Sequence, residues 1–452
     1  MAVGPTGPGG GTPPGVPQDP YAPARTRGYL KLLLIAAVIG VPVCAVSFGF
    51  LALVHELEPL IMQATPRALG FAGTPWWWPV PVLVVAGLLV GLTVRHLPGH
   101  GGHEPADGLA LSGAPALSAL PGIVLAALAS LSFGAVLGPE APLIALGGGL
   151  SAGAARLVGR GLPERSVAAV GAAGSFAAVS ALLGSPLLGA FLLMEVAAPV
   201  GPMLGALLLP GLLASGVGAL IFTGLGDWTG LGTYSLALHD IPRASGPTLS
   251  EFGWALVIGL AAACFGGGVR RLSLLLKERV GRHRVPMTVA MGLVVGALAA
   301  GFALATGKPA TEMLYSGQSA LGSLFRDSAG YSVGALLLLV VCKGLAYCAS
   351  LSAFRGGPIF PALFLGAAGG VILSHLPGLS LTAGFAMGVG ALGVAMLRLP
   401  MTSVLLATLL MGSNGLTVMP LVIVAVVVAH VAALRLTPAT APAAPAPAPS
   451  AG

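Results

Sequence analysis

The sequence predicts an all-α integral membrane protein. Only 8% of its 452 residues are charged, whereas 56% are hydrophobic and the mean hydropathy is +0.95. A soluble domain carries about 25% charged residues because its surface faces water, so most of this surface must face lipid. The apolar runs are continuous and rich in Ala, Leu and Gly, which favours helices over membrane strands. This composition excludes a cytosolic enzyme, a nucleic-acid-binding module and a secreted disulfide scaffold.

Both ends of the chain are predicted to be disordered tails. Residues 1–27 are mostly Gly, Pro, Ala and Thr, and residues 437–452 are mostly Pro and Ala, so neither can bury enough apolar surface to fold. The first apolar segment follows Arg25, Arg27 and Lys31, without the short leading apolar run of a cleavable signal peptide. These three charges favour a cytoplasmic N-terminus, and no soluble regulatory domain is expected after the membrane part.

Residues 28–436 are predicted to form one transmembrane domain in two halves, about 28–225 and 250–436. At roughly 20 residues per span, this length allows about 10 to 16 helical segments. Gly and Pro break many of the runs, as in LGPEAP at 137–142 and RGGP at 355–358. Broken helices at membrane depth are tolerated where they line a cavity enclosed by protein. The sequence therefore predicts an internal pathway.

Polar and aromatic residues mark where the chain leaves the membrane. The triplet Trp76–Trp78 is typical of an interfacial aromatic belt. The stretch between Asp227 and Glu251 is more polar than its surroundings, and a basic cluster ends the apolar run that starts near Phe252. This cluster comprises Arg270, Arg271, Lys277, Arg279, Arg282 and Arg284. The positive-inside rule places the cluster in the cytoplasm and the polar stretch on the opposite side, both as solvated loops.

The two halves contain an internal repeat. GPEAPLIALGGG at 138–149 resembles GPIFPALFLGAAGG at 357–370, and both read G-P-x-x-P, four apolar residues, then Gly. Pro186 follows Pro142 after 44 residues, and Pro400 follows Pro361 after 39. Paired interrupted segments of this kind indicate a transporter with its site at the repeat interface. Ordinary kinked helices that pack through small residues are the alternative.

The broken helices predict the sign of the ligand. A helix that begins inside the membrane after Gly-Pro exposes unpaired backbone N–H groups and the positive end of its dipole. Proline is tolerated in the first turn because N–H groups there lack helical partners anyway. Such a helix start can bind an anion without any cationic side chain. The sequence therefore predicts an anion site where the two starts meet.

Two acidic residues, Glu140 and Glu195, lie deep in apolar runs, where an ionisable group is costly and is a functional candidate. Glu140 stands at the first predicted helix start, so its carboxylate can occupy the anion site itself and leave on protonation. It would then act as gate and proton carrier, although a plain N-terminal helix acid is the alternative. Glu195 precedes Pro199 and either reaches a hydrated interface or relays protons.

The cysteines, one histidine and one arginine of the apolar segments are interpreted next. Cys44, Cys264, Cys342 and Cys348 lie singly in apolar stretches, which predicts small buried hydrophobes and neither a disulfide nor a metal site. His430 is expected to pack, and Arg355 either adds positive potential near an anion path or is a loop arginine at the membrane surface. No cofactor and no catalytic residue are predicted.

In their order along the chain, these motifs resemble the CLC family of chloride channels and proton/chloride antiporters. GPEAP at 138–142 resembles the family motif G-[KR]-E-G-P, and GPIFP at 357–361 resembles G-x-F-x-P. The stretch from GAAG at 171–174 through SPLLGAF at 185–191 resembles the segment that follows the first motif. RLP at 398–400 resembles the start of a late family helix. The match covers nearly the whole membrane region.

The resemblance implies a homodimer of all-helical subunits, with many tilted and broken helices in two inverted-topology repeats and an anion pathway in each subunit. It implies that Glu140 is the gate and that backbone groups surround chloride or a similar anion. The residues concerned are Gly138, Glu140, Ala141, Gly357, Ile359, Phe360 and Gly102. Protons are possible co-substrates, and a multi-pass protein of a bacterial plasma membrane is expected.

Four departures from the family pattern bear on mechanism. The early G-S-G-I-P motif is GGHEP at 101–105, so Gly102 stands where a serine would contact chloride. Pro358 removes one N–H from the second helix start. No tyrosine follows Tyr347, so the late family tyrosine has no counterpart, and the inner proton-accepting glutamate falls on Val196 beside Glu195. These departures leave both channel-like flow and proton-coupled exchange open.

Two other functions remain as rivals. An intramembrane serine protease would use Ser175, in GAAGS at 171–175, with His430 as a distant base, and it requires the two side chains within hydrogen-bond reach. A carrier for a cation or an organic solute would require more polar side chains in the membrane than two acids.

Overall fold

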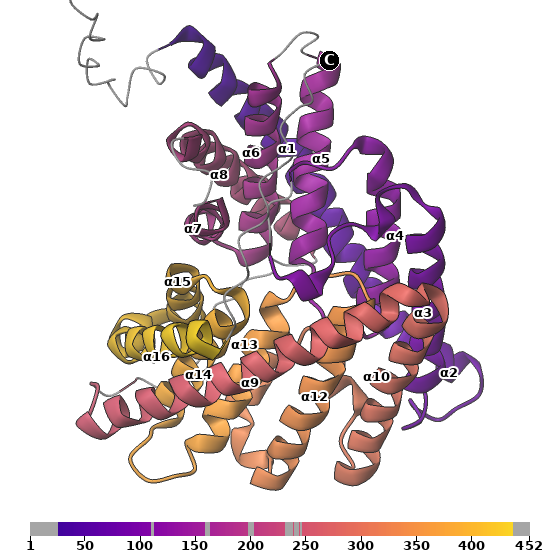
Figure 1. The fold of residues 1–452 in the computed structure, drawn as a ribbon, viewed down its shortest axis with the longest axis vertical. Helices are drawn as coiled ribbons and strands as arrows, with labels where there is room; N and C mark the ends of the chain where they lie inside the picture. Colours follow the sequence, from indigo (N-terminus) through magenta and orange to yellow (C-terminus); the bar gives the residue numbers. More distant parts are fainter. Residues whose placement is uncertain are drawn as a thin grey trace, which may run out of the picture.

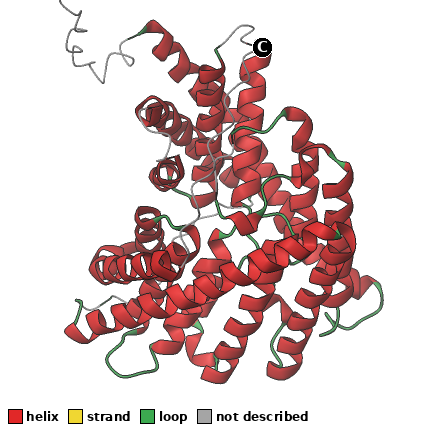
Figure 2. Ribbon diagram, viewed as in Figure 1, coloured by secondary structure: helices red, strands yellow, loops and turns green. Residues whose placement is uncertain are grey.

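The computed structural model describes residues 26–109, 113–158, 163–197, 203–230 and 246–436, together with residues 238 and 244. In these residues the structure is helical apart from loops and one isolated β-bridge (Figure 2). Eight helices are long and apolar enough to cross a membrane. The chain is thus a multi-pass integral membrane protein. Most of the two predicted tails, 1–27 and 437–452, lies outside the described residues.

Within the described residues, seven helices of ten residues or more form the first half, in the upper part and along the right side of Figure 1. They are α1 (Arg27–Pro59), α3 (Pro79–His96), α4 (Leu120–Leu131), α5 (Glu140–Val158), α6 (Glu164–Leu183), α7 (Pro186–Ala197) and α8 (Met203–Thr229). A π-helical turn at Leu60–Ala64 and the short helix α2 (Thr65–Ala68) follow α1. Thr26 caps α1, because its hydroxyl accepts from the N–H of Tyr29.

The second half also contributes seven long helices, drawn from salmon to yellow in Figure 1. They are α9 (Leu249–Arg282), α10 (Arg284–Thr306), α12 (Val333–Ala353), α13 (Ile359–Leu373), α14 (Leu381–Leu397), α15 (Pro400–Leu410) and α16 (Gly415–Leu436). The short helix α11 (Ala320–Arg326) lies between α10 and α12.

The two halves repeat the same helix contacts. Helix α5 packs on α6 as α13 packs on α14, and α8 contacts both α1 and α6 as α16 contacts both α9 and α14. Across the halves, α3 packs on α10, and α7 packs on α15, so equivalent helices meet at the repeat interface. This arrangement confirms a fold of two inverted-topology repeats with many broken helices.

Several helices are too short to cross the membrane. Helices α4, α7, α13 and α15 have 12, 12, 15 and 11 residues, and 15 residues rise only about 22 Å against a hydrocarbon core of about 30 Å. Pro186 and Pro400 begin α7 and α15, where a missing N–H costs least. These helices therefore start or end inside the protein.

Helix pairs in the core approach closely through glycine. On α13, a Cβ at Gly366 would overlap the carbonyl of Gly388 on α14, and Gly370 has the same relation to Gly384. Small residues at such crossings let two backbones touch in lipid, where no hydrophobic force drives helices together. All four cysteines are free and three are buried, but Cys264 is exposed on α9. The prediction that every cysteine is buried was therefore wrong, because α9 turns this position outward.

Candidate anion site

The two predicted helix starts meet at the centre of the molecule. Gly138 and Gly357 form an isolated antiparallel β-bridge, in which each N–H donates to the other's carbonyl, at 2.8 Å from Gly138 and 2.5 Å from Gly357. Helices α5 and α13 begin two residues beyond this bridge. The internal repeat of the sequence therefore becomes a local two-fold arrangement, with both positive helix ends directed to one place.

Serine hydroxyls reinforce this arrangement in a reciprocal way. At the end of α12, Ser350 Oγ accepts from the N–H of Val136, which precedes α5, at 3.0 Å. At the end of α4, Ser130 Oγ accepts from the N–H of Arg355, which precedes α13, at 2.9 Å. Both serines are fully buried. Each repeat thus holds the loop before the other repeat's broken helix, which fixes the relative position of the two starts.

The carboxylate of Glu140 occupies the space between the two starts. Its side chain is fully buried, and Oε1 accepts from the N–H of Phe360 in the first turn of α13 at 2.9 Å. The carboxyl group lies directly against Gly138 and Gly357, where a Cβ on either glycine would overlap its oxygens. Oε2 has no hydrogen-bond partner. Glu140 therefore sits where the helix ends would bind an anion.

No ion pair given by the described residues includes Glu140. A buried carboxylate without a cation is stabilised only by N–H groups and helix dipoles, so protonation or replacement by a free anion competes with it. The N–H groups of Ile359 and of Glu140 itself also lie near the carboxylate. The geometry can therefore exchange the glutamate side chain for an anion of similar size.

Three predicted ligands differ from expectation. The N–H groups of Gly138 and Gly357 pair with each other's carbonyls, so these glycines contribute space rather than donors. The N–H of Gly102 donates to the carbonyl of Gly99 within a turn, and Gly102 packs on Ile123. The expectation that these amides face the anion is corrected, because backbone donors near a turn or a bridge are satisfied locally.

Two residues of α12 were missed by sequence reasoning. Tyr347 is buried, and its hydroxyl donates to the carbonyl of Pro358, directly before α13, at 2.6 Å. Lys343, one turn earlier on the same face, is fully buried, and its Nζ donates to the carbonyls of residues 313–315. The sequence did carry a signal, because Lys343 is a lone cation in the apolar run LLLLVVCKGLAYC. A lone ionisable residue in an apolar run is also the criterion that selected Glu140 among the acids.

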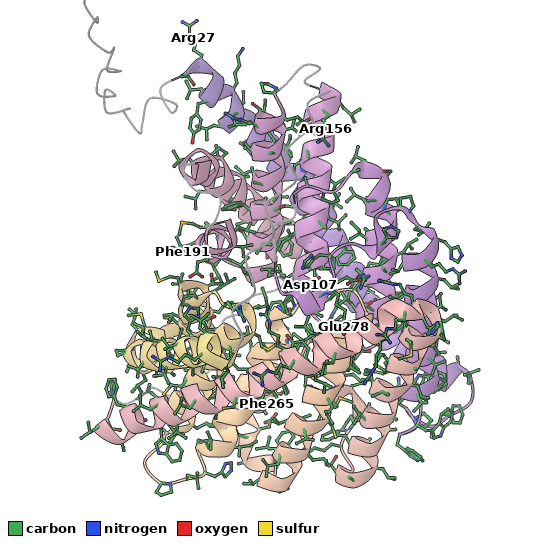
Figure 3. The ribbon with its side chains drawn as sticks, viewed as in Figure 1. Arg27, Asp107, Arg156, Phe191, Phe265 and Glu278 are labelled. Carbon is green, nitrogen blue, oxygen red and sulfur yellow. The ribbon has the colours of Figure 1, made fainter. Side chains whose placement is uncertain are left out.

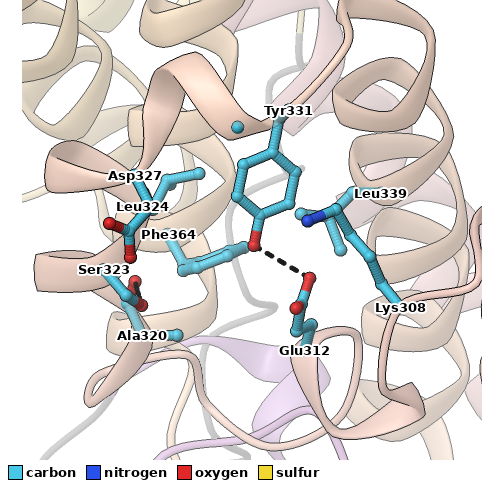
Figure 4. A pocket seen from close by; sticks show the side chains of 10 residues that line it. Lys308, Glu312, Ala320, Ser323, Leu324, Asp327, Tyr331, Leu339 and Phe364 are labelled. Carbon is cyan, nitrogen blue, oxygen red and sulfur yellow. Dashed lines mark hydrogen bonds between the residues drawn. The ribbon is translucent and has the colours of Figure 1, made fainter.

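A polar pocket lies one helical turn along α13 from Phe360. Phe364 lines it, and Lys343 Nζ stands 4.7 Å from the centre of the Phe364 ring. In this pocket of about 230 Å³, Figure 4 shows the hydroxyl of Tyr331 pointing to Glu312, to which it donates at 2.9 Å. Lys308 lies 3.7 Å from the Tyr331 ring centre. The pocket contacts α13 at Phe364, one turn after the residue whose N–H binds Glu140.

On the chain segment before α13, Arg355 is the buried member of an ion-pair network whose other side chains are partly exposed. Its guanidinium contacts Glu104 at 3.2 Å, and Glu104 also pairs with Lys277 and Arg284, both at 2.9 Å. Lys277 pairs in turn with Asp107, which Figure 3 shows beside α9. Arg355 is only 3% exposed, so a loop arginine at the membrane surface is excluded.

The network keeps Glu104 ionised. Partial burial alone would raise the pKa of this carboxyl, but the hydrogen bond from Lys277 and the charge of Arg355 outweigh burial and lower the pKa to about 2. Because the pKa is depressed, the stabilisation from these pairs is present at neutral pH and is lost only as the pH falls toward that value. Arg355 therefore keeps its partner at any pH used to measure transport.

Glu195 lies at the repeat interface and caps a helix. Its carboxylate accepts from the N–H groups of Met401 and Thr402, both at 2.7 Å, and from the Thr402 hydroxyl at 2.5 Å. These donors form the first turn of α15, whose unpaired N–H groups and dipole favour a negative charge. The contact joins α7 to α15, and the two roles expected from the sequence, a hydrated interface position and a proton relay, stay predictions.

We expect Glu195→Gln to lower stability by about 1–2 kcal/mol, because an amide retains one acceptor and loses the charge that the α15 dipole stabilises. The thermal midpoint of purified protein in detergent measures the loss. Glu278→Gln, at an exposed acid of α9, is the matched control and should leave the midpoint unchanged. Loss of proton movement in Glu195→Gln at unchanged stability would contradict the capping role.

The protease rival lacks its geometry. Ser175 Oγ donates to the carbonyl of Ile144 at 3.0 Å, and this serine is buried where α6 packs against α5. His430 lies on α16, which packs on α9 and α14 rather than on α6. In the described part of the chain, no group of three His, Cys, Asp or Glu side chains could hold a metal ion.

Comparison with known proteins decides the family. The family model described as "Voltage gated chloride channel" matches residues 83–434. The chain belongs to the voltage-gated chloride channel family. Two curated relatives, the "Putative ion-transport protein YfeO" of Salmonella paratyphi A and that of Salmonella typhimurium, are each 30% identical to this chain over 356 residues. In both cases the match covers 77% of this chain and 82% of the relative.

Solved structures share the voltage-gated chloride channel fold with this chain. A slow cyanobacterial Cl⁻/H⁺ antiporter aligns with a TM-score of 0.73 and 17% identity, over 90% of this chain and 95% of the other. A CLC-type fluoride/proton antiporter aligns with a TM-score of 0.70 and 20% identity, over 90% and 96%. At these identities the likeness shows the fold, and the family points to transport rather than enzymatic catalysis.

Proposed function

We propose that this protein transports chloride or a similar small inorganic anion through a pathway gated by Glu140. The observation that carries the proposal is the fully buried Glu140 carboxylate between two helix starts, bound by the Phe360 N–H and without an ion-pair partner among the described residues. Backbone donors and helix dipoles suit a monovalent anion, since they supply partial positive charge without holding the ion too tightly to leave.

The family and the two antiporter folds support this assignment by analogy. Both channel-like flow and proton-coupled exchange fit the site, because a carboxylate that leaves the pathway can take up a proton there. The capping role of Glu195 and the valine at 196 favour flow that is not coupled to protons. If flow is uncoupled, Glu140 alone binds protons, and these protons can come from either side of the membrane.

Further proposals concern assembly and location. By resemblance to the family, we expect a homodimer in which each subunit has its own pathway, surrounded by membrane lipid. The curated relatives named above come from bacteria, which supports a bacterial plasma membrane. Cross-linking in native membranes measures the subunit number.

Efflux from liposomes tests the proposal. Vesicles that contain potassium chloride and the purified protein are diluted into chloride-free buffer. Valinomycin is added so that potassium leaves with chloride and no membrane potential opposes chloride efflux. Chloride release above that of protein-free vesicles is expected, and parallel assays with fluoride and nitrate rank the anions. A pH electrode records whether protons move against an imposed chloride gradient. No release of any anion would contradict the proposed function.

A further inference from the structure

An apolar groove of about 210 Å³ is lined by residues of α9, α12, α13 and α14. Figure 1 shows α9 lying across α12 and α14, and it contacts both. Every lining side chain is aliphatic or aromatic, and the remaining positions are glycines of α13 and α14. A Cβ at Gly369 would meet nothing within 4 Å, and Ala261 at the edge of the groove is exposed. The groove is therefore open to the surroundings of the protein.

The groove lies at the depth of hydrocarbon. Two of its lining residues, Ile258 and Phe265, stand about 13 and 24 Å along α9 from its start at Leu249, at 1.5 Å per residue. These distances place the groove near the middle of a hydrocarbon core of about 30 Å. Water would find no polar partner in such a lining, whereas even an apolar cavity of about 150 Å³ stays dry and takes up benzene. The medium available to fill the groove is a lipid chain.

The exposed stripe of α9 changes from apolar to basic along its length. Leu256 and Leu260 are 49% and 53% exposed in the first part, whereas Arg271, Arg279 and Arg282 are exposed in the last part. Positions 260, 271 and 282 are 11 residues apart, which is about three turns, so they share one face of the helix. The positive-inside rule places the basic end in the cytoplasm. The stripe thus passes from the depth of lipid chains to the depth of the cytoplasmic headgroups.

Arg271 stands where a headgroup phosphate meets this stripe. It lies six residues, about 9 Å, beyond Phe265, and its Nη2 donates to the carbonyl of Leu436 at 2.5 Å, which holds it beside the end of α16. Beyond Arg271 the exposed stripe carries two more arginines and one acid, Glu278, so its net charge is positive. Residues 249–264 contain no Lys or Arg. The charge of α9 therefore favours an anionic lipid of the cytoplasmic leaflet over one of the opposite leaflet.

We propose that one anionic phospholipid of the cytoplasmic leaflet binds along α9, with its phosphate at Arg271 and the end of one acyl chain in the groove over Gly369. The apolar groove and the basic residues follow one another across the membrane in the same order as the chain and headgroup of one lipid. The bound chain packs on α13, the helix whose Phe360 N–H binds Glu140. This inference does not depend on which anion the protein moves.

Retention of added lipid tests the site. The purified protein receives equal amounts of dioleoyl phosphatidylglycerol, which is anionic, and dioleoyl phosphatidylcholine, which is zwitterionic, and native mass spectrometry counts the lipids that stay bound. Wild type should retain more phosphatidylglycerol. Arg271→Gln should lower that preference about fivefold, the effect of one cation near a lipid surface. Gly369→Leu should lower retention of both lipids at least tenfold, because its side chain displaces two or more methylene groups from the groove.

Two controls match these variants. Arg67→Gln removes an exposed arginine from α2, at the other end of α1 from the cytoplasmic terminus, and should keep the preference for phosphatidylglycerol. Gly301→Leu adds the same side chain at an exposed position of α10, where a Cβ also meets nothing within 4 Å. It should keep the retention of both lipids.

Three results would overturn the proposal. Equal retention of the two lipids by wild type removes the headgroup site, and unchanged retention in Gly369→Leu removes the groove. If Gly369→Leu instead separates a dimer into monomers while lipid retention stays the same, the groove holds a second copy of the chain. Should Gly369→Leu fail to fold, Ala261→Phe at the exposed edge covers the same groove, and its retention of both lipids decides. Anion efflux from vesicles tests the proposed function separately.

Discussion

Replacing Glu140 with alanine is expected to increase anion efflux from liposomes by about 10- to 100-fold. A hydrogen bond to a charged group contributes about 1.5–3 kcal/mol, which corresponds to this range. The carboxylate now competes with free anions for the Phe360 N–H and for the space between Gly138 and Gly357. Alanine removes that competitor and leaves the helix starts in place.

Glutamine at the same position separates charge from volume. Glu140→Gln keeps the side-chain size and removes the negative charge, so its efflux should lie between those of the wild type and Glu140→Ala. In both variants efflux should no longer depend on pH, because the group that binds the proton is gone. Chloride-selective electrodes and pH electrodes on the same vesicles measure both properties.

A second buried acid serves as the control for these substitutions. Glu251 is 4% exposed, forms the capping box of α9 with Thr248 and accepts from Ser380, away from the gate. Glu251→Gln should therefore change stability but leave the efflux of folded protein within about twofold, since it removes no group that meets the anion. Unchanged efflux in both Glu140 variants would remove Glu140 from the pathway.

Gly357→Ala should reduce efflux at least tenfold. The added Cβ would overlap both the carboxyl oxygen and the Cβ of Glu140, so a methyl group would stand where the carboxylate, and any anion that replaces it, must fit. One methyl at a close-packed contact costs about 1–3 kcal/mol, enough for this loss of occupancy. Initial efflux rates, normalised to the folded protein recovered from gel filtration, measure the effect.

Gly369→Ala is the matched control on the same helix, because a Cβ at Gly369 meets nothing within 4 Å. It should leave efflux unchanged and, as a Gly-to-Ala change within a helix, stabilise the protein by about 0.4–1 kcal/mol. Combining Glu140→Ala with Gly357→Ala removes the clash with glutamate but leaves the methyl in the pathway. If the double variant conducts as fast as Glu140→Ala alone, the pathway does not pass Gly357.

The structure confirms the parts of the prediction that rest on local chemistry. Proline and glycine determine where α5, α7, α13 and α15 can begin, and an acid in an apolar run must have a reason to be there. The meeting of GPEAP with GPIFP was predictable because two similar segments in one chain tend to occupy equivalent places. The antiparallel bridge of Gly138 and Gly357 shows that meeting directly.

Side-chain partners were not predictable in this way. Glu195 was interpreted from its own neighbours in the chain, but its ligands are the N–H groups of Met401 and Thr402, about 200 residues away. The same holds for Arg355, whose ion-pair partner Glu104 and hydrogen-bond partner Ser130 both belong to the other half of the chain. Lys343 carried a signal in the sequence, a lone cation in an apolar run, but its acceptors are backbone carbonyls, which the sequence does not reveal.

By itself, then, the sequence determined the membrane environment, the repeat and the broken helices, and it selected Glu140 as the candidate gate. Each of these follows from composition or from the conformational limits of Gly and Pro, which act over a few residues. The tertiary structure alone decided which N–H groups are free. Those of Gly138 and Gly357 are used in their bridge, that of Phe360 reaches Glu140, and Nε of Arg355 is left without an acceptor. A donor is available only if no nearer acceptor claims it, and that depends on how the two halves pack.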